Sequence, residues 1–271
     1  MAYFEIATVG DNCIDRFGGA GRFSLVGGNA VNVAVQLSRL ERSVAYFGAV
    51  GADNDGRRIL RELARNGVQT RFVRVVQGIT AYTEIELDKT GDRKFVFEEF
   101  GVVRDYRPLA EDVENLCLAR HVHIGWLNDG GALRRELRNR NVSVSQDISV
   151  NAEARNREVA GLDIAFGSNN GPQEEALRFG ADLVQAGARL AVITRGDAGS
   201  LATDGQNVVL IGATPIEAVD TTGAGDAFIA GFLDARLKSL PLAQCLEAGR
   251  KVATAACLHI GGFPQEALSP Q

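Results

Sequence analysis

The chain has 271 residues and a formal net charge of −5; 45% of its residues are hydrophobic and 23% are charged. This balance is typical of a soluble globular protein with a sizeable core, and it excludes a disordered or fibrous chain. No apolar run reaches the roughly 20 residues of a membrane-spanning helix, and no basic stripe marks a nucleic-acid-binding surface.

The four cysteines are scattered along the chain without a Cys-x-x-Cys spacing: Cys13, Cys117, Cys245 and Cys257. This argues against a zinc site and a disulfide framework, so we expect reduced cysteines packed as small apolar residues. The first ten residues enter a strand-like run without a basic leader, which predicts no secretory signal. We therefore expect a cytoplasmic protein whose partners include neither membrane nor nucleic acid.

Short apolar runs alternate with amphipathic runs, a pattern typical of a mostly parallel sheet with helices on both faces. Strands are predicted at residues 4–9, 44–50, 121–124, 142–147, 164–167, 190–194 and 208–211. Helices are predicted at residues 30–40, 55–65, 111–118, 131–139, 173–179, 181–187, 224–237 and 242–259. No linker or repeat interrupts this order, so residues 1–271 are expected to form a single domain.

The middle of the chain predicts a hairpin, because residues 82–87 and 94–100 alternate apolar and polar side chains around a turn at 88–92. With residues 73–76 before it, the hairpin would form a small antiparallel unit, either a plain extension of the sheet or a lid. The glycine-rich residues 16–26 are expected to form a loop that lines the pocket. We therefore expect a lid made of about residues 12–26 and 73–100, whose exposed edge would suit a homodimer.

The strongest chemical signal is the run Asp-Thr-Thr-Gly-Ala-Gly-Asp-Ala-Phe at residues 220–228, which opens a helix. Its glycines let the backbone approach a ligand, and the free N–H groups of a buried helix start form an anion site. Asp226 in this run can cap the helix and can accept the proton of an attacking hydroxyl. From the spacing alone, a plain glycine turn with an N-cap is an equally good interpretation.

This run resembles the signature of the PfkB (ribokinase-like) family of carbohydrate kinases, in which the pattern is close to D-T-x-G-A-G-D. The resemblance implies a ribokinase-like three-layer α/β/α sandwich with a mostly parallel sheet and a small antiparallel β lid. It gives the role of catalytic base to Asp226, and it places an anion hole at the backbone of Gly223, Ala224 and Gly225.

Two N-terminal segments also resemble the family. The segment Gly-Gly-Asn-Ala-Val-Asn-Val-Ala is similar to the part of the family that helps to bind the sugar, although alone it also fits a simple helix start. Its candidate substrate-binding residues are Gly27, Gly28, Asn29 and Asn32. Just upstream, Asp15 matches the family carboxylate that holds sugar hydroxyls, while Asp11 either contributes to that site or is structural.

Residues 192–199 resemble the strand and loop with which the family contacts ATP, although a plain strand and turn is the alternative. The resemblance places nucleotide contacts at Thr194, Gly196 and Gly199. ATP chemistry also implies Mg²⁺, which bridges the β- and γ-phosphate oxygens.

The chain departs from the family at the segment that organises this magnesium, where N-x-x-E is usual. Residues 168–175 carry no such spacing, so Glu174 is the candidate and Glu175 the alternative. The family often binds a monovalent cation such as K⁺ beside the anion hole, and Asp220 and Thr222 fit the beginning of that site, which Gly261 would close.

The resemblance extends from Gly10 to Gly262 and implies an ATP-dependent carbohydrate kinase that phosphorylates a primary hydroxyl of a sugar or sugar-amine. Residues 10–15 and 27–34 look most similar to the fructoselysine 6-kinase (fructosamine kinase) branch, which implies transfer to O6. Ribose, fructose, 2-keto-3-deoxygluconate or a nucleoside remain alternative substrates. A non-catalytic sugar or nucleotide sensor on the same fold is the alternative of a different class.

Overall fold

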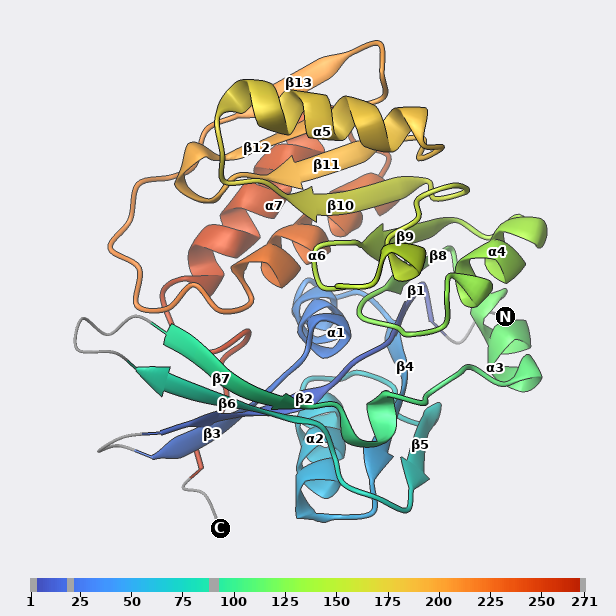
Figure 1. The fold of residues 1–271 in the computed structure, drawn as a ribbon, viewed down its shortest axis with the longest axis vertical. Coiled ribbons are helices and arrows are strands. Elements are labelled where there is room, and N and C mark those ends of the chain that lie inside the picture. The colour runs from blue at the N-terminus through green and yellow to red at the C-terminus, as the bar shows by residue number, and fades with distance from the viewer. Residues whose placement is uncertain (1–3, 19–21, 88–92, 269–271) are drawn as a thin grey trace.

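A nine-stranded sheet forms the centre of the molecule in the computed structural model, which describes residues 4–18, 22–87 and 93–268 (Figure 1). Its strand order is β13-β12-β11-β10-β9-β8-β1-β4-β5. The strands from β11 to β5 are parallel, and β12 and β13 extend one edge in antiparallel pairing. The strand bounds are β1 Ile6–Val9, β4 Val44–Gly51, β5 Val73–Val76, β8 His121–Ile124, β9 Val144–Asp147, β10 Ile164–Ser168, β11 Ala191–Thr194, β12 Ser200–Thr203 and β13 Val208–Ile211.

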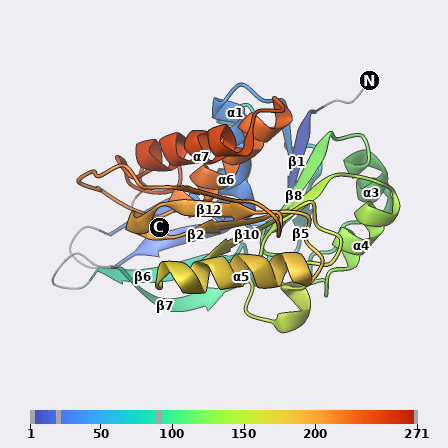
Figure 2. The ribbon, with the colours of Figure 1, turned by 90° about the horizontal axis from the view of Figure 1, so that it is seen from above.

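Helices cover both faces of this sheet because its strands are apolar on both sides. In β4, Val44 and Tyr46 pack into one core, while Ala45 and Phe47 pack into the other. The first face carries α1 (Asn29–Arg39), α2 (Asn54–Arg65), α6 (Ala224–Leu237) and α7 (Leu242–Ala256); the second carries α3 (Ala110–Leu116), α4 (Ala132–Asn139) and α5 (Gln173–Gln185) (Figure 2). The predicted three-layer α/β/α sandwich is confirmed.

A separate four-stranded sheet, here called the small sheet, lies beside the main one (Figure 1). Its order is β3-β2-β6-β7, with bounds β2 Cys13–Phe17, β3 Phe23–Gly27, β6 Tyr82–Leu87 and β7 Arg93–Glu99. Two antiparallel pairs, β2 with β3 and β6 with β7, are joined by parallel pairing of β2 with β6. The predicted hairpin is therefore present, while its turn at 88–92 lies outside the described residues.

Two predictions about this region were wrong. Residues 73–76 do not belong to the small sheet, because β5 pairs in parallel with β4 at the edge of the main sheet. The described part of 16–26 is not a loop but mainly strand, since Phe17, Phe23 and Leu25 pack together with Ile85 as a small core of their own.

Two further differences lie in the C-terminal half. Residues 173–187 were predicted as two helices, but α5 continues through Gly180, which is buried against Leu201 and Thr203 of β12. Strand β12 itself was not predicted, because Ser200 and Thr203 at its ends are polar although they are buried. A pattern of hydrophobic residues therefore does not reveal this buried strand.

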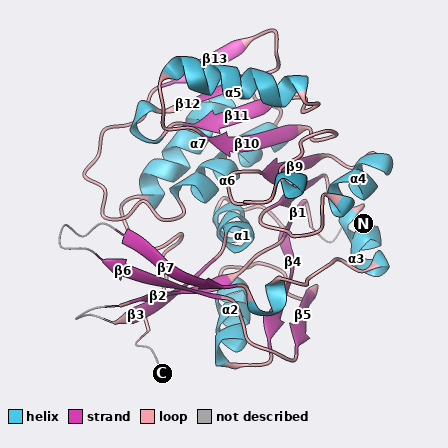
Figure 3. Cartoon of the chain, viewed as in Figure 1, coloured by secondary structure: helices cyan, strands magenta, loops and turns pink. Residues whose placement is uncertain are grey.

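The order of the strands in the main sheet reverses at its centre. The chain runs from β1 outward to β4 and β5, and it then returns to β8 on the other side of β1. Ligands of open α/β sheets bind at such a reversal, beyond the carboxyl ends of the strands. Helices α1 and α6 pack against each other in the first core, and a long loop at residues 212–223 leads from β13 to α6 (Figure 3).

Within the described ranges, no helix is long and apolar enough to cross a membrane. The four cysteines are all unpaired, as expected from their spacing.

The contact between α6 and α7 depends on Gly231, so Gly231→Ala is expected to destabilise the fold by about 1–3 kcal/mol. The added methyl group would lie 2.6 Å from the Ala248 carbonyl oxygen, whereas alanine in an open helix position stabilises by about 1 kcal/mol. Urea denaturation measures the difference. Gly180→Ala is the control, because its methyl group would first meet a side-chain methyl of Thr203, and we expect a change within about 1 kcal/mol. Equal effects of the two substitutions would contradict the tight helix contact.

Candidate active site

The carboxylate of Asp226 lies in the first turn of α6 and is held by two asparagine side chains of α1. Asn29 donates from Nδ2 to Oδ1 at 2.6 Å, and Asn32 donates from Nδ2 to Oδ2 at 2.7 Å. Asn29 and Asn32 are buried, while Asp226 is half-buried. Since each carboxylate oxygen receives one amide N–H, the orientation of the group is fixed. The structure thus brings Asp226 together with two asparagines that lie 197 and 194 positions before it in the chain.

A second carboxylate shares this arrangement. Asp147, the last residue of β9, accepts the other Nδ2 hydrogen of Asn29 at 2.9 Å through Oδ2, and its Oδ1 accepts from Ser149. Burial raises the pKa of Asp226 to about 7; the Asn32 amide opposes this rise, while the negative charges of Asp147 and Asp11 add to it. Burial likewise raises the pKa of Asp147. Asp226 is therefore a basic carboxylate that takes up and releases a proton near neutral pH.

The start of α1 is held in place by Asp11 rather than by a capping side chain of its own. Its N-cap residue is Gly28, with φ 103°, and the Asp11 carboxylate accepts from the amides of Asn29 at 2.7 Å and Ala30 at 3.2 Å. It also accepts from the Trp126 amide at 3.1 Å, which follows β8. Asp11 thus ties the ends of β1 and β8 to the helix that carries the two asparagines, a structural role.

The start of α6 has the features of an anion site. Gly223 caps the helix with φ 73°, and a side chain there would collide with the backbone of Gly262. Ala224 donates to the Thr221 carbonyl at 3.2 Å, but no acceptor among the described residues receives the N–H groups of Gly225 and Asp226. Gly225 is exposed, and a Cβ built on it would meet no atom within 4 Å. The helix start therefore offers free donors and open space.

The other N-terminal candidates lie on the small sheet and at its junction with α1. Asp15 is a buried residue of β2, and its Oδ1 accepts from the Cys13 thiol at 3.3 Å. Gly27, the last residue of β3, leaves no room for a side chain because Asp15 Oδ2 lies against it. Gly28 is equally confined, since its Cβ would lie 2.6 Å from Asn12 Cα. These glycines allow two backbone segments and a carboxylate to meet closely.

The candidate nucleotide-binding residues also lie at the carboxyl ends of the parallel strands, at the end of β11 and in the turn that follows it. Thr194 ends β11 and donates from its hydroxyl to the Gly167 carbonyl at 3.3 Å, and Asn169 donates to the Thr194 carbonyl at 2.9 Å. Gly196, with φ 56°, and Gly199, with φ 93°, shape the exposed turn that follows, and the Asn170 side chain lies beside Gly196. These contacts form one continuous loop surface.

Of the two glutamates at the start of α5, Glu175 lies over the turn between β10 and α5, because its Oε2 would lie 2.7 Å from a Cβ built on Gly171. Glu174 and Glu175 are both exposed. Within the described residues, no group of three or more His, Cys, Asp or Glu side chains could hold a metal ion.

The residues considered for a monovalent cation also meet in space. Asp220 is buried, its Oδ1 accepts from the Thr222 amide at 2.8 Å, and its Oδ2 accepts from the Gly261 amide at 2.7 Å. The carboxylate thereby fastens the loop after α7 to the approach to α6.

Sequence reasoning missed Asp147 and the segment after β8. Asp147 stands at the carboxyl end of a predicted buried strand, which is where parallel sheets place functional groups, so its position was a usable signal. A Cβ atom built on Gly125 would lie 2.6 Å from Asn29 Oδ1, so only glycine fits at this position. The ring of Trp126 stacks on Phe100 after β7 at 4.5 Å between centroids, which joins the small sheet to the main sheet.

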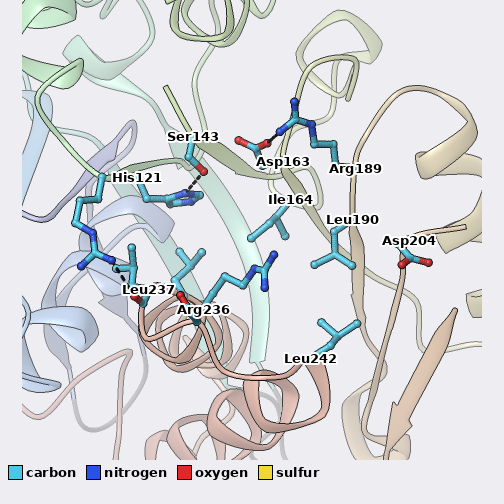
Figure 4. A pocket seen from close by; sticks show the side chains of 13 residues that line it. His121, Ser143, Asp163, Ile164, Arg189, Leu190, Asp204, Arg236, Leu237 and Leu242 are labelled. Atoms are coloured by element: carbon cyan, nitrogen blue, oxygen red, sulfur yellow. Dashed lines mark hydrogen bonds and ion pairs between the residues drawn. The ribbon is translucent and has the colours of Figure 1, made fainter. Parts of the chain in front are cut away.

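A hollow of about 600 Å³ lies at the amino ends of the parallel strands, opposite the carboxyl ends that carry the carboxylate site (Figure 4). It is lined by His121 and Ile164, the first residues of β8 and β10, and by Arg236 in the last turn of α6. Ten residues of helix, about 15 Å, separate Arg236 from Asp226. This hollow is therefore separate from the carboxylate site.

The raised pKa of Asp226 predicts a pH-dependent effect of Asp226→Asn on stability. Because the folded state binds this proton more tightly than the unfolded chain, the contribution is present below pH 4 and is lost as the pH rises towards 7. Asparagine does not titrate, so the stability of the variant relative to the wild type should rise by about 2 kcal/mol between pH 5 and pH 8. Urea denaturation at both pH values measures this change. A pH-independent difference would show that residue 226 titrates as an ordinary aspartate.

Comparison with known proteins identifies relatives over nearly the whole chain. Residues 23–154 and 158–266 match the pfkB family of carbohydrate kinases. The chain is 34% identical over 262 residues to the fructoselysine 6-kinase of Shigella flexneri, covering 95% of this chain and 99% of that protein. It is 29% identical over 264 residues to the fructosamine kinase FrlD of Bacillus subtilis, covering 96% and 93%.

Solved structures share the fold at lower identity. Arabidopsis thaliana ribokinase complexed with ribose and ATP has a TM-score of 0.87 at 20% identity, with 96% of this chain and 94% of that chain covered. A ribokinase II from Escherichia coli in complex with ATP and Mg²⁺ has a TM-score of 0.79 at 18% identity, with 96% and 94% covered. The chain therefore belongs to the pfkB family of carbohydrate kinases and is an ATP-dependent kinase.

Proposed function

We propose that this kinase transfers the γ-phosphoryl group of ATP to the 6-hydroxyl of a fructosamine such as fructoselysine. The single observation that carries the proposal of phosphoryl transfer is the basic carboxylate of Asp226 beside the free amides of the α6 start. The choice of sugar is supported by the similarity to fructoselysine 6-kinase and to fructosamine kinase over more than nine tenths of the chain.

Asp226 is the general base in this proposal. A base with a pKa of about 7 is ionised in a large fraction of molecules at neutral pH and still accepts a proton readily. Asp226 takes the proton of the C6 hydroxyl, the bond from O6 to the γ-phosphorus forms, and the bond from that phosphorus to the bridging oxygen of ADP breaks. The amides of Gly225 and Asp226 donate to the phosphoryl oxygens, on which charge accumulates.

Asp15 and the start of α1 are proposed to hold the sugar, since the Asp15 carboxylate lies against Gly27, the last residue of β3, and α1 begins two residues later at Asn29. Thr194, Gly196 and Gly199 are proposed to hold the nucleotide along the loop after β11. Asn170, whose side chain lies beside Gly196, and Glu174 or Glu175 at the start of α5 are proposed to supply oxygen atoms to Mg²⁺, which prefers such donors. Magnesium, when bound with ATP, offsets the negative charge of the phosphates. Asp220 and Thr222 are proposed to contribute to a K⁺ site next to α6.

A coupled assay of ADP release tests the function across a panel of acceptors: fructoselysine, other glycated amino acids, fructose, ribose, 2-keto-3-deoxygluconate and nucleosides. The proposal expects the highest kcat/KM with a glycated amino acid. Preferred turnover of another acceptor would replace the substrate. Saturable ligand binding without turnover of any acceptor would instead indicate a sugar or nucleotide sensor.

Asp226→Asn is expected to reduce kcat by about 10²–10⁴-fold, because the hydroxyl loses its base, while KM for the sugar changes little. Asp15→Asn is the contrasting variant, since a residue that only holds the sugar should mainly raise KM. Steady-state kinetics with the best acceptor measure both. Near-full turnover by Asp226→Asn would refute the mechanism.

We also propose a homodimer that pairs through the edge of the small sheet. Among the described residues, β7 pairs only with β6, and its side chains Val96 and Phe97 are 50% and 47% exposed. An exposed strand edge of this kind readily pairs with a second copy. Light scattering at micromolar concentration should show a dimer that Phe97→Glu dissociates, whereas Val208→Glu on the main sheet should leave it intact. A monomeric wild-type protein would refute the dimer.

A further inference from the structure

One face of the small sheet carries a row of polar side chains. Asp15 of β2 is in register with Thr83 of β6, and Thr83 is in register with Glu98 of β7. Residues opposite each other on neighbouring strands point to the same face, so the three side chains share one face. The next residue in this row is Leu25 of β3, which contacts Gly261 in the loop fastened by Asp220. The shared face therefore borders the active site.

The opposite face of the small sheet packs on α2 instead. There Arg16 lies 3.8 Å from the ring centroid of Tyr82 and pairs with Asp55 of α2 at 2.9 Å, and Tyr82 contacts Phe97. Glu99, next to Glu98 in the chain, accepts from the Gly101 amide at 2.9 Å. In contrast, the side chain of Glu98, an exposed residue, makes no hydrogen bond or ion pair within the described part of the chain. Glu98 is thus a carboxylate without a structural partner.

The charge around Glu98 is negative. Although residue 98 is exposed, the protein around its carboxylate partly removes water from it, which raises the pKa of Glu98, and the negative charge of Asp11 adds to the rise. The same negative charge of Asp11 also raises the pKa of Asp147 and of Asp226. A ligand with positive charge would relieve this repulsion.

The two asparagines that hold Asp226 also have acceptor atoms without a hydrogen-bond donor. Asn29 and Asn32 are only 6% and 4% exposed, yet the Oδ1 atom of each accepts no hydrogen bond from the described residues. Asn29 Oδ1 and Asp11 Oδ1 both lie beside Gly125, so a second acceptor stands near the first. Acceptors outnumber donors here, which favours a ligand that carries N–H groups.

We infer that Glu98 determines specificity for amine-bearing sugars by pairing with the protonated nitrogen that a fructosamine carries at C1. This inference rests on the proposed function. A fructosamine has its reacting hydroxyl at C6 and its nitrogen at C1, the two ends of the sugar. Asp226 at the α6 start and Glu98 on the small sheet supply one carboxylate for each end. A neutral ketose lacks the charge and gains nothing from Glu98.

Glu98→Gln tests this inference with three sugars: fructoselysine, N-propyl fructosamine and fructose. Loss of a charge-assisted contact should raise KM about tenfold for both amines, and by less than about twofold for fructose. Where a sugar binds without turnover, its inhibition constant replaces KM. Glu84→Gln is the matched control, because Glu84 lies on β6 with its side chain on the other face of the same sheet, and all three constants should stay unchanged.

Three results would overturn the inference. If the wild type phosphorylates both amines and their KM is unchanged in Glu98→Gln, the role of Glu98 is refuted, while the proposed function still holds. An effect on fructoselysine but not on N-propyl fructosamine would mean that Glu98 reads the amino-acid part. A wild-type enzyme that phosphorylates fructose but neither amine would refute the proposed substrate together with this role.

Discussion

Two asparagine amides hold the carboxylate of Asp226, and the chemistry of the site depends on their being neutral. A lysine or arginine in their place would orient the group equally well, but its charge would pull the pKa of Asp226 down and weaken the base. Neutral donors fix the orientation and let burial dominate, so the pKa stays near 7. The neighbouring charge of Asp147, bridged through Asn29, acts in the same direction.

This clamp requires that the starts of α1 and α6 meet at the reversal of strand order. Both helices are buried over most of their length, so their own apolar side chains hold them together and against the sheet. Glycines permit the final approach: Gly223 lies against Gly262, and Gly125 lies against Asn29. The start of α6 also carries N–H groups that no described acceptor receives, and the fold thereby places an anion site and a base side by side. Arabidopsis thaliana ribokinase shares this fold at 20% identity.

Local patterns predicted α6 correctly, since a glycine turn before a small apolar run leaves few alternatives. They did not predict β12, because its terminal serine and threonine are polar although they are buried. They also predicted a helix end at Gly180, where the glycine instead allows α5 to pack closely on β12. The partner sheet of residues 73–76 could not be predicted either, because pairing with β4 is a long-range property. The asparagines were candidates from the sequence, but their contact with Asp226 follows only from the packing of α1 on α6. The place of Asp147 beside Asn29 and the shared face of Glu98, Thr83 and Asp15 depend on sheet order and register, which a local sequence pattern does not reveal.

The most direct measurement is a crystal structure with fructoselysine, Mg²⁺ and a non-hydrolysable ATP analogue bound together. The account predicts that the C6 hydroxyl lies within hydrogen-bond distance of an Asp226 carboxylate oxygen, and that the terminal phosphate accepts from the amides of Gly225 and Asp226. A sugar whose C6 hydroxyl contacts Asp147 or Asp15 instead, with the phosphate away from the α6 start, would contradict it.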